Sequence, residues 1–239
     1  MSEQTTTSPS RSCPYCGRPY PYLTIPAFLG VPERTIQSSH CGCEGELEAE
    51  QRQAYLEKIA YREHVLRRTG IPKIYWGIEQ DTTYLPYIDD PGGVFFHGDA
   101  GRGKTYSAVA LLKAWMNRNT GRRAVFTDAM QLFAFIRRSY DDGDSESAIL
   151  YHFTNADLLV FDDLGKGRPS EWSLERVEGI INGRYTEGLP TVVTSQWAGN
   201  ELVRRLAEGG TYESAEAIVS RITQRCHRVK MDGPDRRLL

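Results

Sequence analysis

The spacing of apolar and polar positions predicts one long helix early in the chain and then strands alternating with helices. Residues 44–68 are rich in good helix formers, and four of their side chains fall near one helical face: Tyr55, Ile59, Arg62 and Leu66. This pattern is typical of an amphipathic helix. Gly70 and Pro72 follow, and residues of these types end helices.

Short apolar runs bounded by turn residues predict buried strands in the rest of the chain. We expect them at residues 93–97, 124–127, 157–161 and 190–194, with a short last strand at 228–231. Helices are expected between them, at residues 106–118, 130–138, 172–185, 201–207 and 215–222, and loops at 71–92 and 141–144. The alternation predicts an α/β domain with a mainly parallel sheet between helices, whose ligand sites lie at the carboxyl ends of the strands.

Three parts of the chain differ in composition. Residues 1–12 are polar and rich in Ser and Thr, which predicts a disordered tail. In residues 13–68 we expect a small knuckle of turns followed by the helix. Residues 69–239 are expected to form the α/β domain. A knuckle of this size cannot bury a hydrophobic core, so a structural metal is expected to replace one.

The overall composition is that of an ordinary globular protein. Of the 239 residues, 29 are Lys or Arg and 31 are Asp or Glu, so the formal net charge is −2 and does not indicate a nucleic-acid partner. The apolar runs are far shorter than the ~20 residues of a membrane helix, and the first residues have no apolar signal region. We therefore expect a cytoplasmic protein with no membrane association.

Four of the five cysteines lie close together near the start of the chain, as Cys13, Cys16, Cys41 and Cys43. Clustered cysteines in a reducing compartment indicate a metal site, and four thiolates suit tetrahedral zinc. The second pair is C-x-C, not C-x-x-C, so His40 is a rival fourth ligand. Reduced thiols or a redox pair are the alternatives, and the prolines around Cys16 disfavour the redox helix. Cys226 is expected to pack in the core.

The segment GDAGRGKT at residues 98–105 fits the Walker A pattern and lies between a predicted strand and a predicted helix. Glycines at 98, 101 and 103 let the loop curl, so that backbone N–H groups surround the phosphates of ATP. Lys104 would contact the β- and γ-phosphates, and the Thr105 hydroxyl would coordinate Mg²⁺.

The segment LLVFDD at residues 158–163 is an apolar strand that ends in two acids, as in a Walker B motif. Asp162 would hold Mg²⁺ through water, and Asp163 would polarise the attacking water. Asp163 is one methylene shorter than the Glu found at this place in many ATPases, so slow hydrolysis is expected. The strand before Gln196 is typical of a sensor strand that places a polar side chain near the γ-phosphate, although an ordinary polar strand end is an equal alternative.

From about Ile71 onward the chain resembles the DnaC/IstB-type branch of AAA+ ATPases, which have a P-loop AAA+ core. The motifs that carry the resemblance are GDAGRGKT, LLVFDDLG, IINGRY (180–185), PTVVTSQ (190–196), IVSRI (218–222) and GPDRR (233–237). The resemblance implies that Arg221 is an arginine finger reaching the γ-phosphate of a neighbouring subunit, with Arg225 as the alternative. It implies that Arg237 is the closing arginine of the family's C-terminal motif, which contacts the nucleotide. Arg184 matches the arginine of its R-Y helix.

The resemblance also implies the partners. Members of the branch load replicative helicases onto DNA or assist transposases in choosing target DNA, and a metabolic P-loop kinase is a third class. Loaders commonly carry an additional N-terminal module, so the 13–68 segment favours a loader that docks on a hexameric helicase. Single-stranded DNA, self-association through the ATP sites, and hydrolysis stimulated by a partner or by DNA are expected with it.

Overall fold

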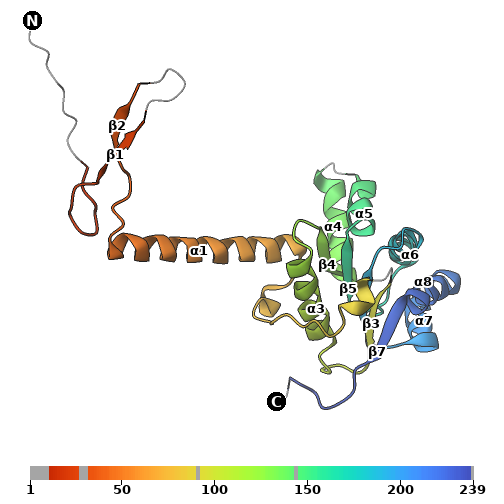
Figure 1. Cartoon of the computed structure of the whole chain (residues 1–239). Coiled ribbons are helices and arrows are strands. Elements are labelled where there is room, and N and C mark those ends of the chain that lie inside the picture. The colour runs from red at the N-terminus through yellow and green to blue at the C-terminus, as the bar shows by residue number, and fades with distance from the viewer. Residues whose placement is uncertain (1–10, 27–31, 90–91, 143–144, 238–239) are drawn as a thin grey trace, which may run out of the picture. The chain divides into compact units, whose positions relative to one another are not determined.

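The computed structural model describes residues 11–26, 32–89, 92–142 and 145–237, without the side chains of 137–142. The chain divides into two compact units, residues 1–64 and 65–239 (Figure 1), and each is described by itself. Among the described residues, none of the helices has the length and apolar character that crossing a membrane demands. Most of the tail expected to be disordered lies outside the described residues.

The first unit contains an antiparallel hairpin where only turns were expected. Its strands are β1 (Tyr22–Ile25) and β2 (Arg34–Gln37), and Leu23 faces Ile36 in their register. Ser12 forms an isolated bridge with Pro19. Both hairpin strands are almost wholly exposed, so the hairpin has no hydrophobic core of its own.

The long helix α1 (Glu44–Thr69) begins in the first unit and is confirmed as a helix. Acidic residues in its first turn and basic residues in its last complement the helix dipole. The predicted amphipathic packing is wrong for most of its length, because the Tyr55 and Ile59 side chains are exposed and, of the apolar residues predicted to share a face, only Leu66 is buried. Gly70 ends the helix with a positive φ of 87°.

The second unit is built on a five-stranded sheet that is wholly parallel. Its strands are β3 (Gly93–His97), β4 (Ala124–Asp128), β5 (Leu158–Asp162), β6 (Thr191–Ser195) and β7 (Cys226–Lys230). Their order across the sheet is β4-β5-β6-β3-β7. Every neighbouring pair is parallel, so all carboxyl ends meet at one edge.

Helices cover both faces of the sheet (Figure 1). One face packs against α3 (Lys104–Arg118), the end of α1 and a connector that contains the 3-10 turn η1 (Lys73–Tyr75) and the short α2 (Pro86–Asp89). The other face packs against α4 (Ala129–Asp142), α5 (Glu146–Thr154), α6 (Glu171–Thr186), α7 (Gly199–Ala207) and α8 (Tyr212–Arg225). The predicted α/β fold is confirmed.

The differences from the predicted elements lie where local signals are weak. Helix α5 was not expected, although Ser145 caps it by accepting a hydrogen bond from the backbone N–H of Ala148. Helix α4 runs on to Asp142, so part of the expected charged loop is helical. Most of the predicted strands shift by one or two residues at an end, which is the usual uncertainty of element boundaries.

Candidate functional site

The glycine-rich loop joins β3 to α3 at the carboxyl edge of the sheet. Gly98, Gly101 and Gly103 all have positive φ angles, of 138°, 77° and 87°, which side-chain-bearing residues rarely adopt. A Cβ atom on Gly101 would clash with the Asp235 carboxylate, and the backbone N–H of Arg236 donates to Gly101 O at 2.9 Å. The C-terminal segment therefore lies directly against this loop.

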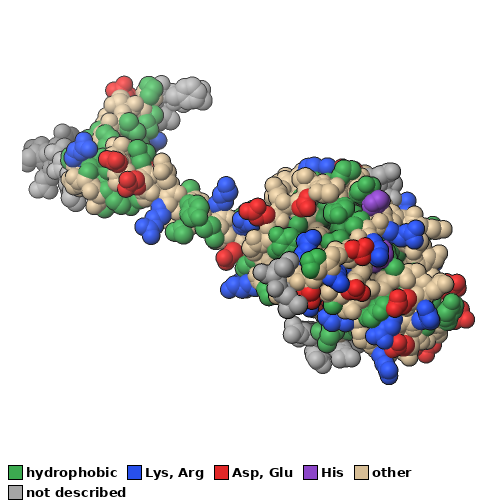
Figure 2. Space-filling model, turned by 90° about the horizontal axis from the view of Figure 1, so that it is seen from below, with side chains coloured by type: hydrophobic (Ala, Val, Ile, Leu, Met, Phe, Trp, Pro, Cys, Tyr) green, Lys and Arg blue, Asp and Glu red, His purple; other side chains and the backbone are tan. Residues whose placement is uncertain are grey.

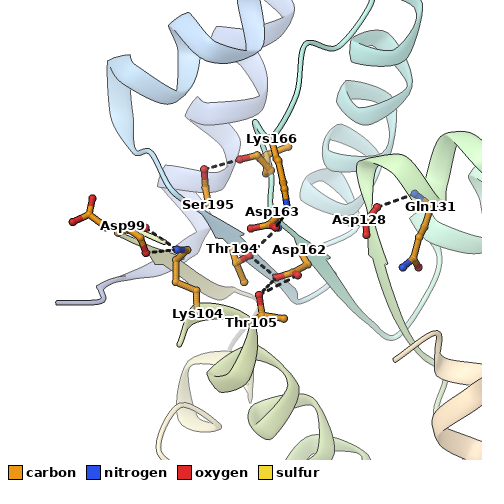
Figure 3. A network of polar contacts seen from close by, with 12 residues as sticks. Asp99, Lys104, Thr105, Asp128, Gln131, Asp162, Asp163, Lys166, Thr194 and Ser195 are labelled. Carbon is orange, nitrogen blue, oxygen red and sulfur yellow. Dashed lines mark hydrogen bonds and ion pairs between the residues drawn. The ribbon is translucent and has the colours of Figure 1, made fainter. Parts of the chain in front are cut away.

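Lys104 is buried, and its ammonium group lies inside the glycine-rich loop. Its Nζ donates to the carbonyl oxygens of Gly98 and Asp99, both at 2.7 Å (Figure 3). Burial lowers the pKa of Lys104, and the charges of Asp163 and Asp162 oppose that shift. A buried ammonium in a turn with no room for a Cβ fits the binding of phosphate oxygens of a nucleotide.

Asp162, the last residue of β5, is buried beside the first turn of α3. Its carboxylate accepts hydrogen bonds from Thr105 Oγ1 at 2.9 Å and from Thr194 Oγ1 at 2.6 Å. Burial raises the pKa of Asp162 to about 6. A carboxylate beside a threonine hydroxyl supplies the hard oxygen ligands that Mg²⁺ prefers, so Thr105 and Asp162 fit this ion.

Asp163 follows β5 in the left-handed region, with a φ of 53°. Among the residues that the structure describes, no other non-glycine residue has a positive φ. Its backbone N–H donates to Thr194 Oγ1 at 2.8 Å, and its Oδ2 accepts from Lys166 Nζ at 2.8 Å. Such a conformation persists only where neighbours hold it, and it is common at functional sites.

The strand β6 contributes Thr194, and not Gln196, to the acid pair. Thr194 is fully buried and contacts both acids, whereas Gln196 lies beyond the end of β6 and is half-buried. The sensor role expected of Gln196 therefore stays a prediction. The sequence feature that could have identified Thr194 as a site residue is its position at the end of the strand next to the acid pair.

Two further charged residues at this edge were missed by the sequence reasoning. Asp128 is paired in register with Asp162, and its Oδ1 accepts the backbone N–H of Gln131 at 2.8 Å (Figure 3). Lys166 lies over Asp163. Neither belongs to a short motif, so only the register and the turn after β5 bring them to the site.

Arg221 and Arg225 lie at the opposite edge of the sheet. Both line a small surface pocket with Gly92, Thr191 and Cys226, which stand at the amino ends of their strands. Arg225 donates to Tyr185 O at 3.4 Å and stacks over the Tyr185 ring, whereas no hydrogen bond or ion pair joins Arg221 to any of the described residues. Arg221 is thus not part of this chain's own phosphate site.

Arg237 and Arg184 have different surroundings. Arg237 is exposed, and its positive charge contributes to lowering the pKa of Lys104, as expected of a residue close to the glycine-rich loop. Arg184 is 1% exposed, and its guanidinium donates to Thr191 Oγ1 and to four backbone carbonyls, those of Phe153, Thr154, Ala156 and Pro190. Arg184 therefore joins α6 to the starts of β5 and β6 and does not contact the site.

The four N-terminal cysteines form one cluster in the first unit, with all four Sγ atoms within 4.8 Å of one another. Cys13 Sγ lies 3.7 Å from Cys43 Sγ, and Cys16 Sγ lies 3.5 Å from Cys41 Sγ. Four sulfurs around tetrahedral zinc at about 2.3 Å stand about 3.8 Å apart, so the cluster fits zinc.

The surroundings of the cluster favour four cysteine ligands. The carboxylate of Glu46 accepts the backbone N–H groups of Cys41 and Gly42, both at 2.6 Å, and so fixes the second cysteine loop. His40 Nδ1 instead lies 3.1 Å from the Glu50 carboxylate, and His40 is not one of the clustered residues. Cys226 is buried in the core of the second unit, as expected.

Comparisons with known proteins agree with this geometry. A family model described as IstB-like ATP binding protein matches residues 77–239. A putative ATP-binding protein in an insertion sequence of Mycobacterium tuberculosis is 26% identical over 172 residues, which are 71% of this chain and 65% of that protein. The replicative helicase loader DnaC of Escherichia coli (strain K12) is 25% identical over 114 residues, 47% of this chain and 46% of that one.

Among solved structures, a crystal structure of the DnaC helicase loader superposes with a TM-score of 0.56 at 27% identity. The match covers 67% of this chain and all of that chain. The chain spans less than two thirds of the length of the curated relatives described above. The relatives include both helicase-loading and insertion-sequence proteins, so the likeness extends to the ATP-binding domain they share.

Proposed function

The chain belongs to the family of IstB-like ATP-binding proteins, with a DnaC-type AAA+ domain, and from this premise we propose that it is an ATP-dependent loader of a replicative DNA helicase. It binds the helicase and helps to place it on single-stranded DNA when replication starts. The observation that carries the proposal is the cysteine cluster in a compact unit of its own, separate from the ATP-binding domain. A partner-docking module is what a loader needs in addition to an ATPase.

The ATPase chemistry is assigned to residues at the carboxyl edge of the sheet. ATP bound in the glycine-rich loop supplies the phosphoryl group, and Mg²⁺ neutralises its charge. Lys104 contacts the phosphates, Thr105 and Asp162 hold the ion, and Asp163 orients the water and accepts its proton. Because the Asp163 carboxylate is short and already bound to Lys166, hydrolysis by the isolated protein is slow.

The position of Arg221, away from this chain's own phosphate site and without a hydrogen bond or ion pair to the described residues, supports a role in a neighbouring subunit. Arginine suits such a role because its guanidinium stays charged and can bind two phosphate oxygens at once. ATP-bound subunits associate with Arg221 completing the next site, and the 13–68 module docks on the hexameric helicase and holds its ring open. Hydrolysis then releases the helicase.

Single-stranded DNA lies along the assembled ATPase domains. On the face of the larger unit that Figure 2 shows, Lys and Arg side chains are interspersed with Asp and Glu. A positively charged groove with stacking side chains is sufficient for such binding and needs no large net charge. DNA contact therefore comes from local groups in the assembly.

The test is to mix the protein with a hexameric replicative helicase and to measure mass by multi-angle light scattering. We expect a larger complex with ATP and Mg²⁺ than with ADP, and no such difference for Lys104→Ala. A variant without residues 1–64 should bind nucleotide and fail to bind the helicase. An unchanged mass with helicases of several replicons, at micromolar concentrations, contradicts the proposal.

A second candidate is an ATPase that assists a transposase in target-DNA selection. The similarity to the mycobacterial insertion-sequence protein, which covers more of the chain than the similarity to DnaC, favours it. This function requires ATP-dependent binding to double-stranded DNA and to a transposase. If the protein binds duplex DNA in preference to single-stranded DNA and forms no complex with a helicase, these results favour the transposase-assisting function.

A further inference from the structure

The turn after β5 brings a lysine back over the acid pair. The backbone N–H of Lys166 donates to Asp163 O at 3.0 Å, and the turn contains two left-handed residues, Asp163 and Gly165. A Cβ on Gly165 would lie 2.8 Å from Leu202 Cδ1, so the side chain of Leu202 in α7 packs closely against the turn. The chain therefore reverses within four residues, and the position of Lys166 follows from the backbone.

Lys166 Nζ makes a hydrogen-bonded ion pair with Asp163 Oδ2 at 2.8 Å (Figure 3). The pair raises the pKa of Lys166, and the carboxylates of Asp162 and Asp128 raise it further. Lys166 is thus the ion-pair partner of Asp163, and its ammonium group also feels the charges of the other two acids at the carboxyl edge of the sheet.

The two residues of this ion pair differ in how strongly the surrounding structure holds them. The backbone around Asp163 is held by Thr194 Oγ1, and the next residue, Leu164, donates its N–H to Thr194 O at 2.8 Å. The Lys166 side chain is 65% exposed, against 25% for Asp163. The backbone of Asp163 is therefore held in place, while its carboxylate is bound by a cation that solvent or a partner protein can reach.

We propose that Lys166 is a positioning residue that holds the Asp163 carboxylate away from the water it acts on, so that ATP hydrolysis stays slow until a docked partner draws Lys166 away. The proposal rests on the proposed function, because it requires Asp163 to act in ATP hydrolysis. The oxygen bound to the ammonium group directs a lone pair to Nζ, and the positive charge makes the carboxylate a weaker base toward a water beside the γ-phosphate. A partner with an acidic group at this loop offers Lys166 an alternative counter-ion.

The expected effect is modest, because exposed ion pairs are weak. Lys166→Met should raise kcat for ATP hydrolysis by about three- to fivefold, and a fivefold change corresponds to about 1 kcal/mol. The affinity for ATP should stay within about twofold. Lys166→Arg keeps the charge and should keep the low rate, whereas Lys58→Met, which removes an exposed lysine from α1, is the matched control.

A second measurement uses the protein without nucleotide. Acetylation by a limiting amine reagent, followed by mass spectrometry, reports how freely each lysine reacts. Because the ion pair holds Lys166 protonated, Lys166 should react more slowly than Lys58. Asp163→Asn should raise the labelling rate of Lys166 severalfold and leave Lys58 unchanged.

The outcomes separate the two proposals. No binding of ATP by the wild type overturns the proposed function, and this inference with it. If the protein hydrolyses ATP but Lys166→Met is no faster, or loses ATP affinity, then Lys166 does not restrain Asp163 and the inference is wrong. A faster Lys166→Met together with faster labelling in Asp163→Asn supports it, and Lys166→Met should add nothing in an Asp163→Asn background.

Discussion

The hydroxyl of Thr194 donates to Asp162 Oδ1 at 2.6 Å and accepts the backbone N–H of Asp163 at 2.8 Å. One buried side chain of β6 therefore sets the carboxylate of the first acid and the backbone of the second. The acid pair at the end of β5 thus has its geometry only when its neighbouring strand is in place.

Replacing Thr194 with Val should disturb both acids. The change leaves the Asp163 N–H without its acceptor and removes one donor from a buried carboxylate, which costs about 2–3 kcal/mol. Urea unfolding of the nucleotide-free protein, followed by tryptophan fluorescence, measures this loss, and ATP hydrolysis should fall at least tenfold. Thr194→Ser keeps the hydroxyl and should retain most of both; a Thr194→Val variant as stable and as active as the wild type would show that the hydroxyl contacts do not matter.

Asp162→Asn should stabilise the nucleotide-free protein in a pH-dependent way. The pKa of Asp162 is about 6 in the fold, above its ordinary value near 3.8, so its stabilising contribution is present at low pH and is lost as pH rises through 6. The free energy of unfolding of the variant minus that of the wild type should therefore rise by about 1–2 kcal/mol between pH 5 and pH 7.5. Denaturation curves in EDTA check this, and a constant difference across this range contradicts it.

Arg184→Met should prevent stable folding of the second unit. The buried guanidinium donates to five acceptors, of which Pro190 O keeps the N–H of Leu159 in the variant, and each buried acceptor left unpaired costs about 1–3 kcal/mol. The sum is comparable with the whole stability of an ordinary domain. Soluble yield and melting temperature are the measurements. Arg122→Met, at an exposed position, should change neither; a soluble Arg184→Met with an unchanged melting temperature would contradict this reading.

The cysteine cluster should bind about one equivalent of zinc. Replacing Cys13 and Cys16 with Ser should remove the metal and unfold the first unit, because a hairpin with exposed strands has little else to stabilise it. Metal analysis by mass spectrometry and proteolysis of residues 11–43 report the two effects. His40→Ala and Cys226→Ser should keep the metal; loss of zinc in His40→Ala would make the histidine a ligand.

Arg221→Ala should lower ATP hydrolysis without lowering ATP affinity. The expected loss is at least tenfold, because an arginine finger acts only on the transition state. Mixing Arg221→Ala with Asp163→Asn should restore activity, since the second variant supplies fingers to the intact sites of the first. Arg225→Ala should be close to the wild type, because Arg225 already contacts Tyr185. A mixture as inactive as its components would exclude Arg221 as a finger in a neighbour.

The sequence predicted the parts of the site that short motifs contain. Gly98, Lys104 and Asp162 were expected at one edge of a parallel sheet, and the structure places them there, because the carboxyl ends of parallel strands share an edge. Thr194, Asp128 and Lys166 depend on strand order, register and a turn closed by one hydrogen bond. No short pattern encodes those contacts.

In helix α1 the sequence predicted packing that the structure does not show. Its period suggested a buried face, yet Tyr55 and Ile59 are exposed, because helical spacing predicts which side chains share a face but not whether anything covers it. The hairpin was missed since each of its strands is only four residues long. Arg184 could be matched to a motif, whereas its five buried acceptors could be recognised only in the folded chain.

The placement of the glycine-rich loop and Arg221 at opposite edges of one sheet also constrains how copies can be arranged. Subunits that complete one another's sites must bring the amino ends of the strands of one subunit to the carboxyl ends of the strands of the next, which a head-to-tail row does. An open row always has one terminal subunit whose site lacks a donor. The two ends of such a row would be chemically different, so the proposed assembly would have a direction.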